Sequence, residues 1–528
     1  MASSNSNRKQ VFNAAALVGV LFAFNSILGY VRLQLIARYF GVSAAADAYA
    51  LTSPIPELLF NIIAGGALGA AFIPVFASYF ADEDNPDNAG AWATFSAIIN
   101  MVVLATVVVS ALAALFAPQL LALSIARDSE TFRLSVPLLR VMLLTPIIFG
   151  IGGVFSAALN ARQHFLAPAL GANLYSVGII GGLILFPGNL MGIGYGVVAG
   201  ASLYWLVQIP AWRRLEGEYR PKSPINTPAV RRILWLMAPR VLGLSFSQFN
   251  PIIVNFIAQS LLEGSMAALA FGFRIMSMPQ AIIGRALGVA SFPTFAVLAK
   301  QSKFEEMRRI LSDTLRLIIF IGTPITLGLV VLAEPLIGLA LRYGAFDETA
   351  SILTARALQF YAVGLVALAI IEIASRSFYA LEDTTTPVVI GAVQLITMLM
   401  FSYWLGRIVF PNRGWIALGG VALGFSLSNW LEVGLLLGLL RPKMGGIDGA
   451  RIAIGFGKMT IAGIAMTLCM FAVLWLTSGL ADSAILLLVR LALAGGAGTI
   501  IYAGVCYLIA VTEMRNAITW IMRRLGRR

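Results

Sequence analysis

The sequence contains a single histidine, His164, and only two cysteines, Cys469 and Cys506. One histidine argues against a His-rich metal site or a histidine proton relay, and two cysteines inside apolar segments argue against a disulfide framework. A Walker-type phosphate loop is also missing, which argues against ATP hydrolysis by this chain. No set of nucleophile, base and orienting residue stands out. We therefore predict no cofactor, no metal site and no enzymatic activity.

Charged residues are scarce too. They make up 12% of the 528 residues, whereas 59% are hydrophobic; soluble domains carry about 25% charged residues. The hydrophobic residues form blocks of roughly 20 to 30, long enough to cross a hydrocarbon core about 30 Å thick as a helix. Backbone groups in lipid must bond within their own segment, so these blocks are helices. The predicted fold class is an all-α polytopic membrane protein.

The blocks predict about fourteen membrane-spanning helices. Their approximate ranges are 11–39, 47–80, 91–118, 134–161, 165–187, 191–212, 230–262, 265–299, 307–333, 351–381, 386–410, 415–440, 451–477 and 482–511. The longest polar connection follows the sixth helix and is typical of a surface linker. We therefore expect an N-terminal lobe (1–212), a cytoplasmic linker (213–229), a C-terminal lobe (230–440), and two last helices with a basic tail (441–528).

The net charge of +13 follows the membrane topology. With the N-terminus placed inside, we count 21 lysines and arginines in or near the inside loops and 6 outside. This is the positive-inside bias of membrane proteins. It predicts that both termini are cytoplasmic and that the partners are anionic lipids rather than nucleic acid. The N-terminal segment has no small-residue cleavage site, so it is interpreted as the first spanning helix.

One segment occurs twice. Residues 65–77 read GGALGAAFIPVFA and residues 284–296 read GRALGVASFPTFA, with eight of thirteen positions identical and a spacing of 219. Pro168 and Pro387 share this spacing. A period of six helices predicts two lobes in the same membrane orientation, as in several transporter folds. The alternative is chance similarity between Gly/Ala-rich helices, whose small residues serve packing alone.

Charged side chains inside spans are costly, at roughly +2.5 to +3.5 kcal/mol each at a helix centre. Arg32, Arg240, Arg274 and Arg285 come from the first, seventh and eighth helices and have few acidic neighbours in sequence. Arginine binds phosphate in a bidentate manner and stays charged, so these four predict an anionic ligand; internal ion pairing is the alternative. Simpler explanations suit the other charges: snorkelling for Arg140, Lys458 and Arg490, pairing of Glu372 with Arg376, a helix end for Glu334, and a solvated turn for the acidic loop 82–88.

The N-terminal run NSILGYVRLQLIARYFGVSAAADAYALTSPIPELL, the repeated helix and the segment FRIMSMPQAIIGRALGVASFPTFA resemble the MurJ (MviN) family of lipid II flippases. The resemblance covers nearly the whole chain. It implies the exporter fold of the multidrug/oligosaccharidyl-lipid/polysaccharide (MOP) superfamily, with two six-helix lobes around a cavity whose arginines hold a pyrophosphate. It also implies that the last two helices form a groove for the lipid tail.

By position, Arg32 and Arg274 match two family arginines, and Asp47 matches a family aspartate. Ser26 and Phe60 stand where the family usually has arginines, and Gly65 where a glutamate is common. Arg240 and Arg285 are candidates to replace the lost charge.

The resemblance therefore implies a transporter that flips lipid II between leaflets of a bacterial inner membrane by alternating access. Arg32, Arg274, Arg240 and Arg285 are the predicted pyrophosphate ligands, with Asp47, Glu57 and Ser26 as supporting polar residues. Two alternatives stay open: a flippase for another polyprenyl-linked glycan, and a non-transporting scaffold for cell-wall assembly. Cell-wall synthesis proteins are further candidate partners.

Overall fold

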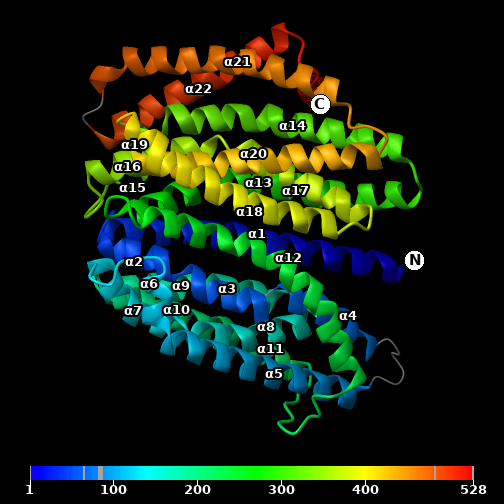
Figure 1. Cartoon of the computed structure of the whole chain (residues 1–528). Coiled ribbons are helices and arrows are strands. Elements are labelled where there is room, and N and C mark those ends of the chain that lie inside the picture. The colour runs from blue at the N-terminus through cyan, green and yellow to red at the C-terminus, as the bar shows by residue number, and fades with distance from the viewer. Residues whose placement is uncertain (1, 64–65, 81–86, 481–482, 526–528) are drawn as a thin grey trace. The chain divides into compact units, whose positions relative to one another are not determined.

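A computed structural model describes residues 2–63, 66–80, 87–480 and 483–525. All regular structure in these ranges is helical, as predicted (Figure 1). The chain divides into two compact units, Met1–Met266 and Ala267–Arg528, and each is described by itself. The lobe boundaries expected at 212, 230 and 440 stay a prediction.

The first unit is built from twelve helices within the described ranges. They are α1 (Ala2–Phe40), α2 (Ala44–Thr52), α3 (Pro54–Ile63), α4 (Gly66–Ser78), α5 (Asn88–Leu115), α6 (Ala117–Ala122), α7 (Glu130–Met142), α8 (Thr145–Ala161), α9 (Leu166–Leu185), α10 (Leu190–Leu206), α11 (Ile209–Arg214) and α12 (Pro228–Ala258).

The second unit begins just inside α13 (Ser265–Lys300). It continues with α14 (Phe304–Val331), α15 (Ala333–Leu341), α16 (Glu348–Ala362), α17 (Leu365–Ala380), α18 (Thr385–Trp404), the π-helical turn Leu405–Val409, α19 (Phe410–Asn412), α20 (Ala417–Lys443), α21 (Gly449–Leu476), the 3₁₀ turn Ser478–Leu480, α22 (Ala484–Leu508) and α23 (Thr512–Leu525).

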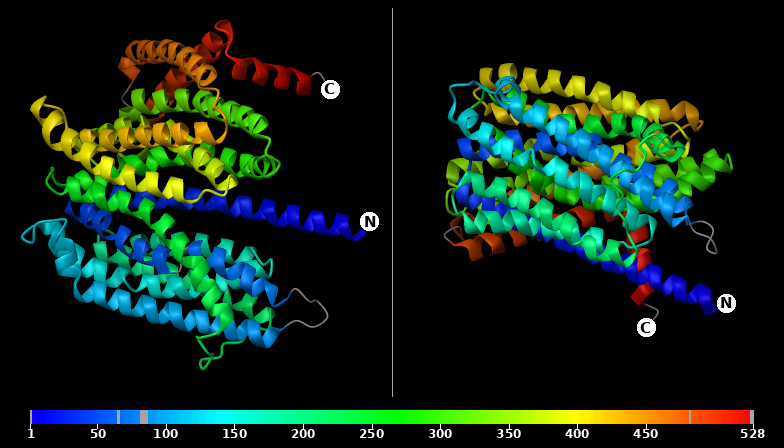
Figure 2. Two further views of the ribbon diagram at one scale, coloured as in Figure 1. Left: turned by 45° about the vertical axis from the view of Figure 1, so that its right-hand side comes forward. Right: turned by 90° about the horizontal axis from the view of Figure 1, so that it is seen from below.

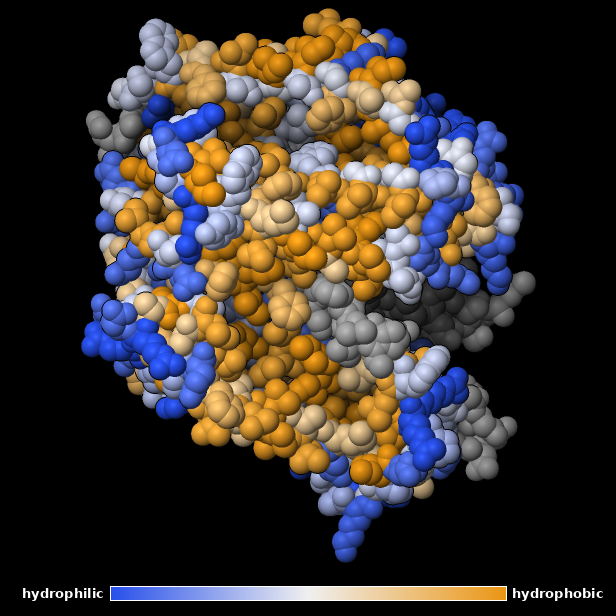
Figure 3. Space-filling model, in the orientation of Figure 1, coloured by the Kyte–Doolittle hydropathy of each residue, from blue (hydrophilic) through white to orange (hydrophobic). Residues whose placement is uncertain are grey.

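Within the described ranges, ten helices are long and apolar enough to cross a membrane, or eleven when the bent pair α16 and α17 counts as one span. The other three predicted spans, 11–39, 47–80 and 230–262, coincide with α1, with α2 to α4, and with α12. On the face shown in Figure 3, hydrophobic side chains gather over the middle of the helices and hydrophilic ones over their ends. This is the surface expected of a protein with lipid as its solvent.

The repeat seen in the sequence recurs in the helix boundaries. Helix α8 ends at Ala161 and α9 begins at Leu166, while α17 ends at Ala380 and α18 begins at Thr385; both pairs of boundaries differ by 219 residues. The turns match as well. Gln163 has φ 60° and Glu382 has φ 59°, a left-handed conformation that is uncommon outside glycine. The two halves therefore share one chain path around these turns.

The halves differ at the duplicated helix. The single span predicted over 47–80 is interrupted, because α2 ends at Thr52 and α3 begins at Pro54. Proline lacks the N–H that would continue the helix and clashes with the preceding turn. In the second half α13 runs unbroken over 36 residues, with Pro279 and Pro293 inside it.

Small residues bring neighbouring helices into close contact in both units. A Cβ on Gly178 of α9 would lie 2.3 Å from Gly200 Cα of α10, and one on Gly424 of α20 would lie 2.4 Å from Ser402 N of α18. These helix pairs lie in corresponding parts of the two halves. Only glycine permits such close approach, which is the usual packing device of membrane helices.

Candidate functional site

Two of the predicted ligands lie in the first unit. Arg32 is half-buried on α1, and in the described part of the chain it has no carboxylate partner and donates no hydrogen bond. A half-buried arginine of this kind can bind an anion without first breaking an ion pair. Arg240 lies in the middle of α12, but its side chain is outside the described residues.

The other two lie on α13 in the second unit. Arg274 is exposed, and the Arg285 side chain is outside the described residues. The two positions are eleven residues apart. At 3.6 residues per turn this is close to three turns, so both positions lie on nearly the same face of α13, about 16 Å apart along its axis. An anionic group moving along this face would pass one position and then the other. A site shared by all four arginines stays a prediction, because the pairs belong to different units.

The supporting residue Asp47 is buried in the first turn of α2, with 3% of its surface exposed. Its Oδ2 accepts a hydrogen bond from the Gly264 backbone N–H at 2.7 Å. A buried carboxylate needs such donors to stay charged. Asp47 therefore holds the connection between α12 and α13. The other two supporting candidates, Ser26 on α1 and Glu57 on α3, are exposed.

Two more hydrogen bonds reinforce this joint. The Ala44 N–H donates to Glu263 Oε1 at 3.1 Å, and Asn255 Nδ2 donates to the Ala50 carbonyl at 2.8 Å. Gly264 has φ +84°, and a Cβ there would lie 2.2 Å from Val42 Cγ1. We call these contacts the α2–α12 joint. It consists of bonds from both ends of α2 to the last turn of α12 and the loop that follows.

Most of the other charges inside spans have local partners. Glu372 and Arg376 form the predicted ion pair, with Oε1 3.0 Å from Nε. Three further cations lie against backbone carbonyls near helix ends: Arg140 with Ala114, Lys458 with Ala510, and Arg490 with Leu474. Each side chain reaches a carbonyl of another part of its unit, and snorkelling to the membrane interface stays a prediction.

Sequence reasoning missed the most buried ion pair among the described residues of the second unit. Arg316 Nε on α14 lies 2.8 Å from Glu513 Oε1, and Arg316 Nη2 donates to Oε2 at 3.0 Å. The two side chains are 7% and 9% exposed. No local pattern marks the pair, because 197 residues separate its members. The one signal was Arg316 itself, a charge within the predicted span 307–333.

A second missed pair joins the last residue of α20 to the loop between α17 and α18. Lys443 Nζ donates to Asp383 Oδ2 at 2.6 Å, and the Thr386 hydroxyl donates to the same oxygen at 2.6 Å. Burial alone would raise the pKa of Asp383, but the bonds from Lys443 and Thr386 outweigh it and lower the pKa to about 2. Asp383 is therefore ionised at any physiological pH.

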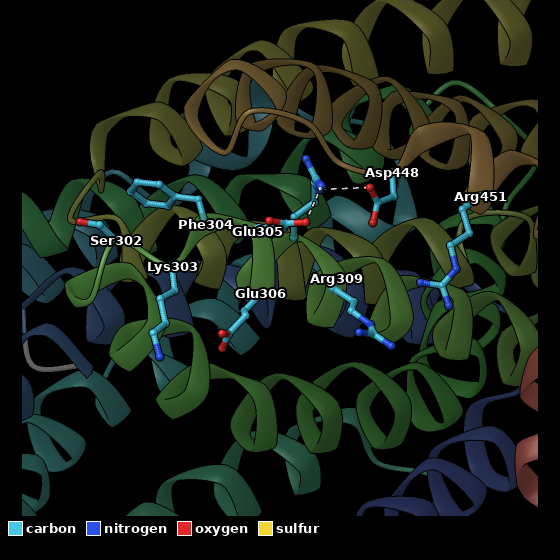
Figure 4. Close-up of a pocket in the computed structure, with 9 residues that line it drawn as sticks. Ser302, Lys303, Phe304, Glu305, Glu306, Arg309, Asp448 and Arg451 are labelled. Carbon is cyan, nitrogen blue, oxygen red and sulfur yellow. Dashed lines mark ion pairs between the residues drawn. The ribbon is translucent and has the colours of Figure 1, made fainter.

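A polar pocket of about 560 Å³ lies where the α13–α14 turn meets the α20–α21 loop (Figure 4). Lys303, Arg309 and Arg451 lie among Glu305, Glu306 and Asp448 on its walls. Arg308 lies 3.1 Å from Asp448 and 3.9 Å from Glu305. Four cations and three carboxylates line the pocket, and Arg308 is already paired, so the pocket is mixed in charge rather than a basic anion site.

Some predictions fall outside the described residues: Gly65, most of the acidic loop 82–88, and the tail residues Arg527 and Arg528. Over the ranges that are described, no group of three histidine, cysteine, aspartate or glutamate side chains could hold a metal ion.

Most of the chain matches one known protein family. The family model described as "Lipid II flippase MurJ" matches residues 36–490. The lipid II flippase MurJ of Burkholderia cenocepacia is 28% identical over 401 residues, covering 74% of this chain and 78% of that protein. A probable lipid II flippase MurJ of Vibrio cholerae is 26% identical over 479 residues, covering 88% and 89%.

Two solved structures resemble the fold. A lipid II flippase MurJ in an inward closed conformation superimposes with a TM-score of 0.76 at 22% identity, covering 94% of this chain and all of that one. An inward-facing multidrug resistance MATE transporter of the MOP superfamily gives a TM-score of 0.67 at 16% identity, covering 81% and 98%. The fold is therefore one that the two kinds of transporter share.

Proposed function

Because the chain belongs to the MurJ lipid II flippase family, we propose that it flips lipid II, the undecaprenyl-pyrophosphate-linked peptidoglycan precursor, from the inner to the outer leaflet. The observation that carries this proposal is the family match over residues 36–490, which includes most of the predicted N-terminal lobe and all of the predicted C-terminal lobe. The family consists of transporters, which are not a class of enzyme. Alternating access is the mechanism, in keeping with the inward closed state of a solved relative of the same fold.

In this mechanism the cationic residues of both units bind the pyrophosphate. Arg32 and Arg274 are the principal ligands, with Arg240 and Arg285 adding positive charge. A guanidinium presents a planar fork that matches two phosphate oxygens, and each such charge-assisted bond is stronger than a neutral one. Because Arg274 and Arg285 lie along one face of α13, the headgroup moves along that helix during transport. Ser26 and Glu57 are exposed residues of the first unit that supply further polar contacts.

The chain is a multi-pass membrane protein, and we place it in the bacterial inner membrane with both termini in the cytoplasm. Its basic inside loops then face the anionic lipids of the cytoplasmic leaflet. Cell-wall synthesis proteins that make or consume lipid II are its expected protein partners.

A flipping assay in proteoliposomes tests the arginine assignment. Lipid II flipping is compared for the wild type, Arg274→Ala and Arg32→Ala, with Arg342→Ala as control because Arg342 is an exposed loop residue paired with Glu348. A hydrogen bond to a charged group contributes about 1.5–3 kcal/mol. Each test variant should therefore bind lipid II roughly 10- to 100-fold more weakly. Wild-type flipping by both variants would overturn the arginine assignment.

The same assay separates the alternatives. A flippase for another polyprenyl-linked glycan would transport that lipid and leave lipid II in place. A scaffold would transport neither, even as wild type. Rescue of cells depleted of their own lipid II flippase provides the matching test in vivo, and failure of the wild type to rescue them counts against the proposed substrate.

A further inference from the structure

The last helix, α23, is fixed to the second unit by a packed turn. Helix α22 ends at Leu508, and the chain turns through Ala510, whose φ is +55°. The Val511 N–H then donates to the Cys506 carbonyl at 2.8 Å, and the Val511 side chain is buried. In Figure 2, α23 (red) leaves the end of α22 at an angle to it. The turn therefore sets the direction of α23.

The buried ion pair is the second attachment. Glu513 lies in the first turn of α23 and pairs with Arg316 of α14: Arg316 Nη2 donates to Oε2 at 3.0 Å, and Nε lies 2.8 Å from Oε1. This charge-assisted hydrogen bond attaches the first turn of α23 to α14. One turn before Arg316, Asp313 pairs with Arg451, which also lines the polar pocket. Helix α23 therefore begins at the pocket end of the unit, where the basic loops expected to be cytoplasmic lie.

Beyond its first turn, α23 has two distinct faces. Met514, Ala517, Ile518 and Met522 recur at spacings of three and four and share one face of the helix. Asn516, Thr519 and Arg523 lie on the opposite face and are exposed. Arg515 is exposed as well and lies at the border between the two faces, beside Met522, which is seven residues or about two turns away. Met522 is 60% exposed although it belongs to the apolar face. The unit therefore leaves part of this apolar face uncovered.

The charge of α23 indicates what covers it. Its one acidic residue, Glu513, is already paired with Arg316, whereas Arg515, Arg523 and Arg524 are basic. An apolar stripe beside a basic polar face is the pattern of helices that lie in the plane of a membrane surface. Helices α14, α21 and α22 are long and apolar enough to cross a membrane, and α14 and α21 begin, and α22 ends, at the end of the unit from which α23 starts. A bilayer surface is therefore expected at this end.

We propose that α23 binds the surface of a bilayer rich in anionic lipids, with its apolar face in the acyl-chain boundary and its arginines against the headgroups. The Arg316–Glu513 pair then ties this surface helix to the spanning helix α14. The proposal concerns a different surface from the predicted pyrophosphate site, and its test contains no lipid II.

Spin-label depth in nanodiscs tests the proposal with the full-length protein. Labels are placed singly at Met522→Cys and Thr519→Cys in a background of Cys469→Ala and Cys506→Ala. Collision with oxygen and with a water-soluble nickel chelate then gives the depth of each label. The nanodiscs contain phosphatidylcholine alone or phosphatidylcholine with phosphatidylglycerol.

We expect the label at 522 to lie about 5–10 Å below the headgroup surface in the anionic discs, while the label at 519 stays in water. The double variant Arg515→Gln/Arg523→Gln should return the 522 label to its depth in phosphatidylcholine. The control Arg213→Gln/Arg214→Gln removes the same charge from exposed residues of α11 and should change nothing. Equal water access of both labels in both lipid mixtures would overturn the proposal and leave the apolar face to a protein partner.

Discussion

The backbone N–H of Ala44 donates a hydrogen bond to the carboxylate of Glu263, and these two residues are 219 positions apart, the spacing of the internal repeat. Counterpart positions of the two halves thus bond directly to each other. Asp47 and Gly264 lie beside them and form a second bond of 2.7 Å. The α2–α12 joint is therefore a fixed point close to the end of the first unit, and it should be sensitive to substitution.

Gly264→Ala should destabilise the protein markedly. The residue has φ +84°, and the new Cβ would lie 2.2 Å from Val42 Cγ1 and 2.9 Å from the Val42 backbone. An L-residue in the left-handed region costs about 1–2 kcal/mol before any clash is added. Thermal unfolding in detergent measures the change.

Gly188→Ala is the matched control for this prediction. Gly188 has φ +72° with nothing within 4 Å of its Cβ position, so only the backbone term applies. A smaller loss of about 1 kcal/mol is expected. Equal losses for both variants would show that the contact with Val42 carries no strain.

Glu513→Gln should cost about 3–5 kcal/mol, because it leaves the Arg316 charge buried without a counter-charge. The exposed pair of Arg342 and Glu348, with side chains 53% and 71% exposed, is the control. Glu348→Gln should cost no more than about 1 kcal/mol. The double variant Arg316→Met/Glu513→Leu should recover most of the loss, since it removes both charges. If Glu513→Gln is as mild as the control, the pair does not stabilise the unit.

Lys443→Gln should lower stability in a pH-dependent way. The pKa of Asp383 is depressed to about 2 in the folded protein, against an ordinary value of 3.8. The folded state thus favours ionised Asp383, and this stabilisation is present above pH 3.8 and lost as pH falls through 2. The difference in melting temperature between wild type and Lys443→Gln should therefore shrink across this window. In an Asp383→Asn background the difference should not vary with pH there.

Gln163→Gly and Glu382→Gly should both stabilise the protein. Each residue holds a left-handed φ, 60° and 59° respectively, in counterpart turns of the repeat. Glycine adopts this conformation without the steric cost but loses more chain entropy, so the net gain should be up to about 1 kcal/mol. The two turns belong to different units, and the gains should add in the double variant. Alanine at either position should give no gain.

The helical fold and its repeat could be predicted because their causes are local in sequence. Apolar length predicts spans, and the shared offset of Pro168 and Pro387 predicts matching helices, which begin at Leu166 and Thr385. The interruption of span 47–80 was not predicted, although Pro54 and Pro56 in the sequence are its physical cause. A run of apolar residues shows that a segment lies in the membrane but not whether it is one straight helix.

The polar contacts could be predicted only in part. Glu372 and Arg376 are four residues apart on one helix, so their pairing follows from helix geometry. Arg316 meets Glu513 only through tertiary packing, which one sequence does not encode in any local pattern. For Asp47 the resemblance indicated a polar role near the substrate, whereas its observed bond is to the Gly264 backbone; its contact with substrate stays a prediction.

The separation of Arg316 and Glu513 also has a consequence for synthesis. At about 5–20 residues per second, the ribosome needs roughly 10–40 s to add the 197 positions between them. During that interval α14 carries the Arg316 guanidinium, while Glu513, which supplies its counter-charge, has not yet been synthesised. Among the ion pairs of the described residues, this one is completed by the residue closest to the end of the chain. The second unit can therefore reach its final packing only after Glu513 has been synthesised and has paired with Arg316.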